Sequence, residues 1–147
     1  MSEAEIASAR GTCLCGAVAI QAKSLKPKVD ICHCVMCRRW GGGPFMGLSA
    51  SAFEVSGREH ITAFPSSDWA ERAFCSKCGS NLWYRFTPTD HHSFAAGLFE
   101  IDDGAVIEQQ IFVDEKPAFY DFAQDTPMKT GAQIIAEAEA SGLTFDN

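Results

Sequence analysis

Cysteines are the residues of this 147-residue sequence with the most evident chemistry, and all seven occur in three short groups. The groups are Cys13-Leu-Cys15, Cys32-His-Cys-Val-Met-Cys37 and Cys75-Ser-Lys-Cys78. Thiolates that bind one metal ion must be clustered, whereas disulfides need only cysteines that meet in pairs. The clustering and the odd number therefore favour metal binding over a disulfide framework or a set of inert buried thiols.

The first and last groups together predict a closed zinc site. In an extended strand residues i and i+2 face the same side, so Cys13 and Cys15 can both bind one ion. Cys75-x-x-Cys78-Gly79 is typical of a metal-binding turn, in which the glycine allows a positive φ. Two plus two gives a tetrathiolate, and we expect this zinc site to stabilise the fold.

The middle group predicts a second zinc site, of the catalytic type. Its ligands are Cys32, Cys34 and Cys37. A zinc ion with three protein ligands keeps its fourth position open for a substrate. The sequence does not determine whether a further side chain fills that position or how fully the zinc site is occupied.

Four histidines could supply a further ligand, and we expect each to have a more ordinary role. His33 lies between two ligands and would point away from them in an extended segment, so we interpret it as a residue supporting the site or as a surface residue. His60 begins an expected strand. His91 and His92 follow a Pro/Thr/Asp turn and are expected in a solvated loop.

Arg38 and Arg39 directly follow the middle group. They could bind a substrate carboxylate through bidentate hydrogen bonds, or they could be solvated charges. The glycines of the segment 41–44 either let the backbone approach a ligand or form a plain connection. The sequence leaves both alternatives open.

The elements that position these residues are expected to be mainly β-strands. Short β-rich runs are separated by Gly, Pro, Asp and Ser clusters, as in antiparallel all-β domains. The expected strands cover residues 17–22, 29–33, 45–49, 60–64, 69–74, 81–86, 93–96 and 105–113. One clear helix is expected over residues 131–140, with Gly142 as its stop.

Composition limits the partners and the compartment. The 12 Lys and Arg against 19 Asp and Glu give a formal net charge of −7, which disfavours nucleic acids and anionic membrane surfaces. No run approaches the ~18 apolar residues of a membrane span, and no apolar signal segment follows Met1. We therefore expect a cytoplasmic protein without membrane or nucleic-acid partners. Disulfides are uncommon in the cytosol, which again favours metal binding.

Four motifs carry a resemblance to a known family. They are Gly11-Thr-Cys-Leu-Cys-Gly-Ala-Val18, Cys32-His-Cys-Val-Met-Cys-Arg-Arg-Trp40 with the following Gly-Gly-Gly-Pro44, Phe74-Cys-Ser-Lys-Cys-Gly-Ser80, and Ile111-Phe-Val-Asp-Glu-Lys-Pro117. Together they resemble the glutathione-dependent formaldehyde-activating enzyme family, whose zinc domain is of the CENP-V/GFA type. The resemblance extends to about Pro127, so we expect a leader over 1–10, a zinc domain over 11–127 and a tail over 128–147 with a short helix.

The resemblance implies a β-tent (Mss4-like) fold of antiparallel sheets with two zinc ions per chain. In this family pattern Cys13, Cys15, Cys75 and Cys78 match the structural site, and Cys32, Cys34 and Cys37 match the catalytic one. The implied activity is that of a carbon–sulfur lyase, which reversibly adds glutathione to formaldehyde to give S-hydroxymethylglutathione. The alternative is a non-catalytic, zinc-stabilised protein-interaction module on the same scaffold. The sequence does not choose the thiol, the aldehyde or the general base.

Overall fold

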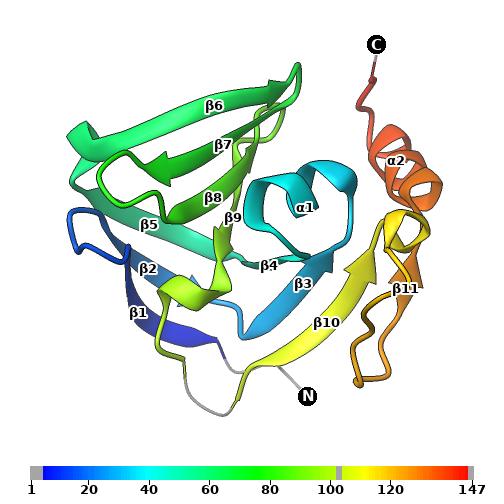
Figure 1. Ribbon diagram of the computed structural model, residues 1–147, viewed down its shortest axis with the longest axis horizontal. Helices are drawn as coiled ribbons and strands as arrows, with labels where there is room; N and C mark the ends of the chain where they lie inside the picture. Colours follow the sequence, from blue (N-terminus) through cyan, green and yellow to red (C-terminus); the bar gives the residue numbers. More distant parts are fainter. Residues whose placement is uncertain (1–4, 102–103, 146–147) are drawn as a thin grey trace. The chain divides into compact units, whose positions relative to one another are not determined.

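The structure, a computed structural model, describes residues 5–101 and 104–145 and consists mainly of β-strands (Figure 1). The strands are β1 Ile6–Thr12, β2 Ala19–Leu25, β3 Lys28–Cys32, β4 Phe45–Leu48, β5 Ala50–Ser56, β6 Ile61–Ser67, β7 Ala70–Cys75, β8 Asn81–Phe86, β9 His91–Ala95, β10 Val106–Ile111 and β11 Met128–Lys129. The helices are α1 Val35–Gly41 and α2 Gly131–Ala140, with short 3-10 helices η1 Arg58–His60, η2 Ala96–Leu98 and η3 Val113–Glu115. None of the helices in the described ranges has the length and apolar character needed to cross a membrane.

The chain divides into two compact units that alternate along the sequence. Among the described residues, unit 1 extends to Lys28 and resumes from Gly47 to Val106, and unit 2 comprises Val29–Met46 and the residues from Ile107 onward. The first and last cysteine groups therefore belong to unit 1, and the middle group belongs to unit 2.

Unit 1 contains two antiparallel arrangements of strands. One is the sheet β1-β2-β5, in which Ala22 of β2 lies opposite Ala9 of β1 and Phe53 of β5. The other has the strand order β4-β9-β8-β7-β6, with Gly47 and Leu48 of β4 opposite Ala95 and Phe94. Residues two apart on a strand face one side, which gives each arrangement one apolar face.

Aromatic side chains fill the core of unit 1. Phe94 on β9 is fully buried, and its ring meets Phe53 of β5 edge-on at 4.9 Å between centroids. Trp83 and Phe99 also meet Phe94 edge-on, at 6.2 and 6.1 Å. Such edge-to-face contacts add to the free energy gained by burying the rings. Because Phe53 and Phe94 lie on different sheets, the same cluster packs the two arrangements of strands together.

A glycine is required where β5 turns into η1. Gly57 has φ +80°, and a Cβ atom on it would lie 1.9 Å from the carbonyl oxygen of Ala17. Only glycine avoids both the left-handed strain and this overlap.

Unit 2 is built on β10, which pairs in parallel with β11 and neighbours β3. Helix α1 begins after Cys34 and ends at Gly42, which has φ +85° and donates its N–H to the Arg38 carbonyl at 2.7 Å. Helix α2 begins with a capping box, in which Thr130 and Gln133 each accept the other's backbone N–H. Both ends of α1 and the start of α2 thus follow ordinary capping chemistry.

The predicted fold class, antiparallel β-sheet with a short C-terminal helix, is confirmed. Strand β8 and helix α2 have the predicted bounds, and the other expected strands agree with β2, β3, β4, β6, β7, β9 and β10 to within a few residues. Three strands were not predicted: β1, β5 and the two-residue β11.

Three expectations are corrected. Residues 6–10, expected in a leader, belong to β1 and pair with β2, while residues 1–4 lie outside the described part. Cys13 and Cys15, expected on an extended strand, lie after β1 where the chain turns, and α1 forms after Cys34, where no element was expected. His91 and His92 lie in β9 and not in a loop, and the ring of His92 lies 4.7 Å from that of Phe53. Local turn residues before His91 outweighed the strand pattern in the sequence-based reading.

Candidate metal centres

The four cysteines of unit 1 converge as predicted. Cys13 and Cys15 follow β1, Cys75 ends β7, and Cys78 lies in the turn before β8. All four Sγ atoms lie within 4.8 Å of one another. We call this cluster the quartet.

The spacing of the quartet fits a tetrahedral zinc ion. The Sγ atom of Cys15 lies 3.6 Å from that of Cys13 and 3.8 Å from that of Cys75. Four sulfur atoms bound to zinc at about 2.3 Å are about 3.8 Å apart along each tetrahedral edge. None of the cysteines is in a disulfide. The donor set and its spacing therefore suit zinc.

The backbone around the quartet stabilises thiolates. Val18 donates its N–H to Cys13 Sγ at 3.3 Å, and Gly79, with φ +78°, donates to the Cys75 carbonyl at 2.7 Å. The Ser80 hydroxyl lies 3.2 Å from Cys78 Sγ, and hydrogen bonds from Ser80 lower the pKa of Cys78 to about 5. The glycine after the second cysteine thus provides the predicted metal-binding turn.

The thiols of the quartet also change one another's pKa values. Although burial raises the pKa of Cys13, hydrogen bonds from Val18 and from neighbouring thiols lower it below the ordinary value. For Cys15, the backbone N–H of Ala17 lowers the pKa, but burial and neighbouring thiols raise it to about 11. Four thiolates this close therefore need a cation between them, which is a further sign that the residues suit a divalent metal.

The three cysteines of unit 2 form a second cluster, which we call the trio. Cys32 ends β3, Cys34 is the N-cap of α1, and Cys37 lies in its first turn. Their Sγ atoms lie within 4.8 Å of one another. Hydrogen bonding with Cys34 and Cys37, with burial second, raises the pKa of Cys32. These thiols also cannot all ionise without a cation.

The helix that the sequence reading missed explains how the trio converges. Residues three apart lie on the same face of a helix, so α1 directs Cys34 and Cys37 to one side. The Sγ atom of Cys34 accepts the N–H of Cys37 at 3.3 Å. Among the described residues, no histidine or carboxylate joins the trio within the same limit. The trio therefore offers three donors, as a site with an open position requires.

His33 is buried beside the trio and is fully engaged with other residues. Its Nδ1 atom lies 2.8 Å from the Tyr120 hydroxyl, and its Nε2 atom lies 2.9 Å from Gln110 Oε1. Burial lowers the pKa of His33. The interpretation of His33 as a supporting residue agrees with this geometry, whereas a surface position does not.

The hydrogen bonds define the direction of each donor in this network. Thr126 donates its hydroxyl to the Pro127 carbonyl and accepts from Gln110 Nε2, at 3.2 Å each. Gln110 Oε1 must then face His33 as an acceptor, so His33 Nε2 carries a proton. In the neutral ring Nδ1 is an acceptor, and Tyr120 donates to it.

Charged side chains lie around His33, the residue between two ligands of the trio. Arg38 donates from Nε to the His33 carbonyl at 3.2 Å, and Arg39 is exposed. Lys116 forms an ion pair with Asp121 at 2.8 Å, and its Nζ lies 5.1 Å from the centre of the Tyr120 ring. Arg38 therefore has a structural bond in addition to its charge, while Arg39 is available to a ligand. The predicted substrate contacts of both arginines stay a prediction.

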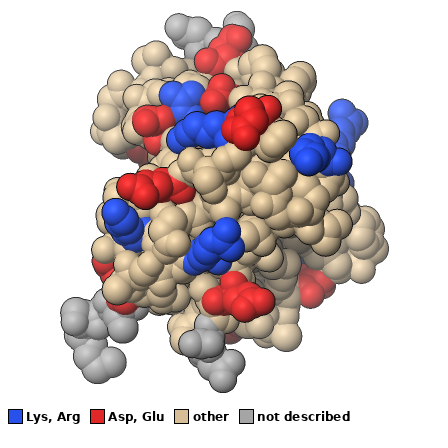
Figure 2. Space-filling model, turned by 90° about the vertical axis from the view of Figure 1, so that its left-hand side faces the viewer, with Lys and Arg blue, Asp and Glu red and all other residues tan. Residues whose placement is uncertain are grey.

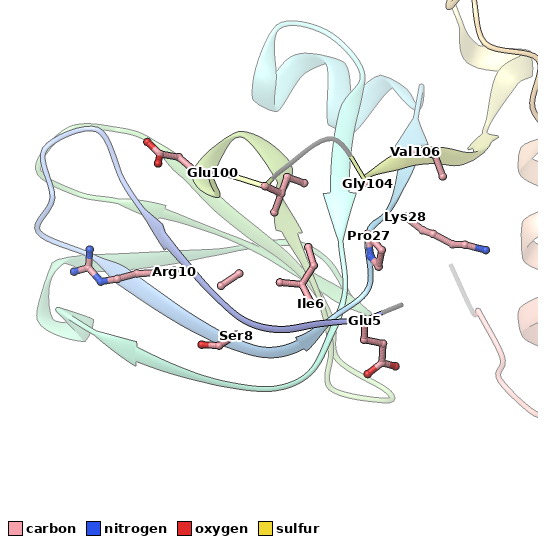
Figure 3. A pocket seen from close by; sticks show the side chains of 11 residues that line it. Glu5, Ile6, Ser8, Arg10, Pro27, Lys28, Glu100, Gly104 and Val106 are labelled. Carbon is pink, nitrogen blue, oxygen red and sulfur yellow. The ribbon is translucent and has the colours of Figure 1, made fainter. Parts of the chain in front are cut away.

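Two cavities are lined by residues of unit 1. One, of about 600 Å³, is lined by Ile6, Pro27, Lys28 and Val106 among others, and its lining includes no cysteine or histidine (Figure 3). Another, of about 630 Å³, reaches Cys13 of the quartet beside Leu14. Neither lining combines the groups that an acid–base or nucleophilic reaction needs.

The charges on one face of the molecule have mixed signs. Figure 2 shows Lys and Arg side chains next to Asp and Glu side chains on the face in view. A nucleic-acid site needs a basic stripe, which this face does not form.

Sequence reasoning missed the polar residues that support the trio. These are Gln110, Glu115, Tyr120 and Thr126. Each is a common residue type without a recognisable spacing to the cysteines. The signal that pointed to this part of the chain was the motif Ile111–Pro117, which contains Glu115 and follows Gln110 directly.

The fold and the two clusters first define a class: mainly β proteins with two cysteine clusters that could hold metal ions. The family model described as glutathione-dependent formaldehyde-activating enzyme matches residues 8–115. The chain belongs to this family, which confirms the resemblance of its motifs.

Two relatives agree with this assignment. A Schizosaccharomyces pombe protein described as an uncharacterized lyase is 37% identical over 127 residues, which cover 85% of this chain and 93% of that protein. A Rhodobacter sphaeroides protein of known crystal structure matches with a TM-score of 0.55 and 26% identity, over 64% of this chain and 91% of that one. The likeness thus extends to both sequence and fold.

Proposed function

We propose that this protein is a zinc-dependent carbon–sulfur lyase that reversibly adds glutathione to formaldehyde to give S-hydroxymethylglutathione. The trio Cys32, Cys34 and Cys37 holds the catalytic zinc, and the quartet Cys13, Cys15, Cys75 and Cys78 holds a structural zinc. The observation that carries the proposal is the three-donor geometry of the trio in a chain of this family. A site with three protein ligands leaves room for a substrate sulfur atom.

The reaction joins the glutathione sulfur to the formaldehyde carbon, and the thiol proton ends on the former carbonyl oxygen. When bound, zinc stabilises a thiolate at neutral pH and so supplies the nucleophile. The chain's own thiols hold the site, while Arg39, which is exposed beside the trio, attracts a glutathione carboxylate. Arg38 assists through its charge.

Tyr120, which is hydrogen-bonded to His33, is a further side chain that orients the reactants. Both ring nitrogens of His33 are engaged, so His33 itself is not the base. Tyr120 donates its hydrogen to His33 and presents oxygen lone pairs, which can accept a hydrogen bond from the hydroxyl group of the adduct. Burial, with a smaller contribution from Cys32, raises the pKa of Tyr120, so the phenol stays neutral at physiological pH.

A direct test is exchange NMR of glutathione, formaldehyde and their adduct with the zinc-loaded protein. We expect the protein to accelerate exchange above the spontaneous rate. Cys34→Ser should abolish the acceleration and lower the zinc content from two ions towards one per chain. Met36→Leu alters an exposed neighbour in the same helix and should keep both.

The second candidate is a zinc-stabilised interaction module without catalysis, favoured if the trio is closed by a fourth ligand. X-ray absorption at the zinc edge distinguishes the two, because the proposed enzyme should show a ligand at the trio that glutathione displaces. Exchange at the spontaneous rate, together with an unchanged spectrum on adding glutathione, would reject the enzyme.

A further inference from the structure

Two consecutive carboxylates of η3 reach two different helices in unit 2. Glu115 Oε1 accepts the N–H of Val35, the first residue of α1, at 2.9 Å. Asp114 Oδ1 accepts the N–H of Gly131, the first residue of α2, at 2.7 Å. The element that carries them follows Phe112, which has φ +55°. A non-glycine residue in this conformation indicates that the direction of η3 is imposed by its surroundings.

The bond to Val35 lies between two ligands of the trio. The first N–H groups of a helix have no partner within it. In α1, Cys34 Sγ accepts the N–H of Cys37, and Glu115 accepts that of Val35. The backbone that joins Cys34 to Cys37 is therefore held at one point by a ligand sulfur and at another by Glu115.

The same ligand segment has further attachments to β10. His33 donates its backbone N–H to the Ile111 carbonyl at 3.1 Å, and its side chain binds Gln110. These bonds fix the residue between Cys32 and Cys34. Among the attachments described here, Glu115 is the one that fixes the start of α1, from which Cys34 and Cys37 both project.

We propose that Glu115 is a positioning residue for the metal site of the trio, where it fixes the first turn of α1 in the conformation that brings the three thiolates together. This inference rests on the proposed function only in requiring a metal at the trio. A side chain that orients metal ligands without binding the metal typically contributes about 10–100-fold to metal affinity. The effect of Glu115 comes from the hydrogen bond that its carboxylate accepts from Val35. The negative charge of the carboxylate disfavours ionisation of the thiols and therefore does not account for the effect.

The experiment measures metal affinity at both clusters of the full chain, with the quartet as an internal control. Chelator competition gives the zinc affinities, and ¹¹³Cd²⁺ NMR gives a separate signal for each cluster. We expect Glu115→Ala to weaken zinc binding at the trio by about 10–100-fold and to shift its ¹¹³Cd signal. Both readouts at the quartet should stay at the wild-type values.

Two variants separate the hydrogen bond from charge and from general damage. Glu115→Gln keeps an acceptor for the Val35 N–H and should restore most of the affinity. Asp114→Ala removes an equal charge one residue away, where the bond is to α2, and should leave the trio affinity unchanged. If Glu115→Ala does not fold, Glu115→Met takes its place, because methionine fills a similar space but offers the Val35 N–H no oxygen acceptor, and the same loss at the trio is expected.

Three outcomes would overturn the inference. The first is wild-type affinity at the trio in Glu115→Ala, and the second is an equal loss in Glu115→Ala and Asp114→Ala. The third is a loss in Glu115→Gln as large as that in Glu115→Ala, since the bond would then not be the cause. A wild-type trio that binds no metal would reject this inference and the proposed function together, whereas a trio that binds metal without accelerating exchange would reject the proposed function alone.

Discussion

At the scale of single residues, the polar atoms buried beside the trio satisfy one another. Gln110 is almost fully buried, and both ends of its amide have partners, His33 on one side and Thr126 on the other. A buried polar group without a partner costs more free energy than a hydrogen bond contributes when formed. The network is therefore sensitive to the loss of its central member.

Gln110→Leu should destabilise the protein by about 1–3 kcal/mol, because it leaves the His33 Nε2–H without an acceptor in a buried site. Chemical denaturation of the zinc-loaded protein measures the change. The neighbouring Gln109→Leu, at a half-buried position, is the matched control and should change stability by less than about 0.5 kcal/mol. Equal effects of the two substitutions would show that the network contributes nothing specific.

His92 is a second residue whose surroundings determine its chemistry. Its ring packs against Phe53, Trp83 and Phe94, and Nδ1 donates to the Asp90 carbonyl at 3.0 Å. Burial lowers the pKa of His92 below the ordinary value near 6.5. The folded protein thus favours the neutral ring.

The resulting pH dependence has a definite sign. Below the ordinary pKa the unfolded chain binds a proton that the folded chain does not, so the stabilisation from His92 is complete above about pH 6.5. It is lost as the pH falls towards the folded-state pKa. In His92→Phe this part of the pH dependence should disappear, so the stability difference from wild type should change between about pH 7 and 5. A constant difference for His92→Phe would contradict the assignment.

At the scale of elements, the packing of α2 against the residue that follows β10 requires a glycine, which has no side chain, at position 131. A Cβ atom on Gly131 would lie 2.8 Å from ring atoms of Phe112. Because Phe112 already has a positive φ, its ring has little freedom to move away. Gly131 is therefore needed for packing and not for a special backbone conformation.

Gly131→Ala should destabilise the protein by about 1–3 kcal/mol through overpacking, although alanine is the better helix former. Thermal unfolding measures the effect. Phe112→Leu removes ring atoms from the contact, so adding it to Gly131→Ala should cost less than the sum of the two single changes. Strict additivity in this double-mutant cycle would mean that the two residues do not interact.

The sequence predicted elements well where the pattern is local. The helical spacing of apolar residues and the stop at Gly142 predict α2 with its observed bounds, and a short run rich in apolar and aromatic residues identifies β8. Helix α1 has only seven residues, with Cys34 as its N-cap and Cys37 in its first turn, so it carries no helical periodicity. Its first N–H is accepted by Glu115, a residue eighty positions away in the chain. A contact of that range leaves no mark on a local pattern.

For the candidate sites, the sequence predicted the metal ligands but not the residues that support them. Cysteine spacing alone separated the quartet from the trio, because metal ligands must be clustered. The partners of His33 could not be inferred, since Gln110 and Tyr120 are brought to it by the fold and have no sequence relation to it. Residues that bind a metal are recognisable from their type, whereas residues that support them are recognisable only from structure.

At the scale of the whole molecule, the two clusters belong to different units and join different spans of chain. The quartet joins Cys15 to Cys75, which both belong to unit 1 and lie 60 positions apart in the sequence, whereas the trio spans residues 32–37 of unit 2. A cross-link that closes a long loop removes more conformational entropy from the unfolded chain than one that closes a short loop. Metal at the quartet should therefore contribute more to stability than metal at the trio.

Cys78→Ser should lower the thermal midpoint of the zinc-loaded protein more than Cys34→Ser does. A loss of about 4 kcal/mol, as for a cross-link closing a loop of this length, corresponds to about 8–16 °C for a chain of about 150 residues. By the same relation, closing the five-residue interval of the trio contributes about 2 kcal/mol, so Cys34→Ser should lower the midpoint by about half as much. Chelation of zinc should bring the wild-type midpoint to or below that of Cys78→Ser, because the chelator removes the cross-links of both clusters. Scanning calorimetry of the three proteins with and without chelator measures these shifts. A larger loss in Cys34→Ser than in Cys78→Ser would show that the trio, and not the quartet, is the structural centre.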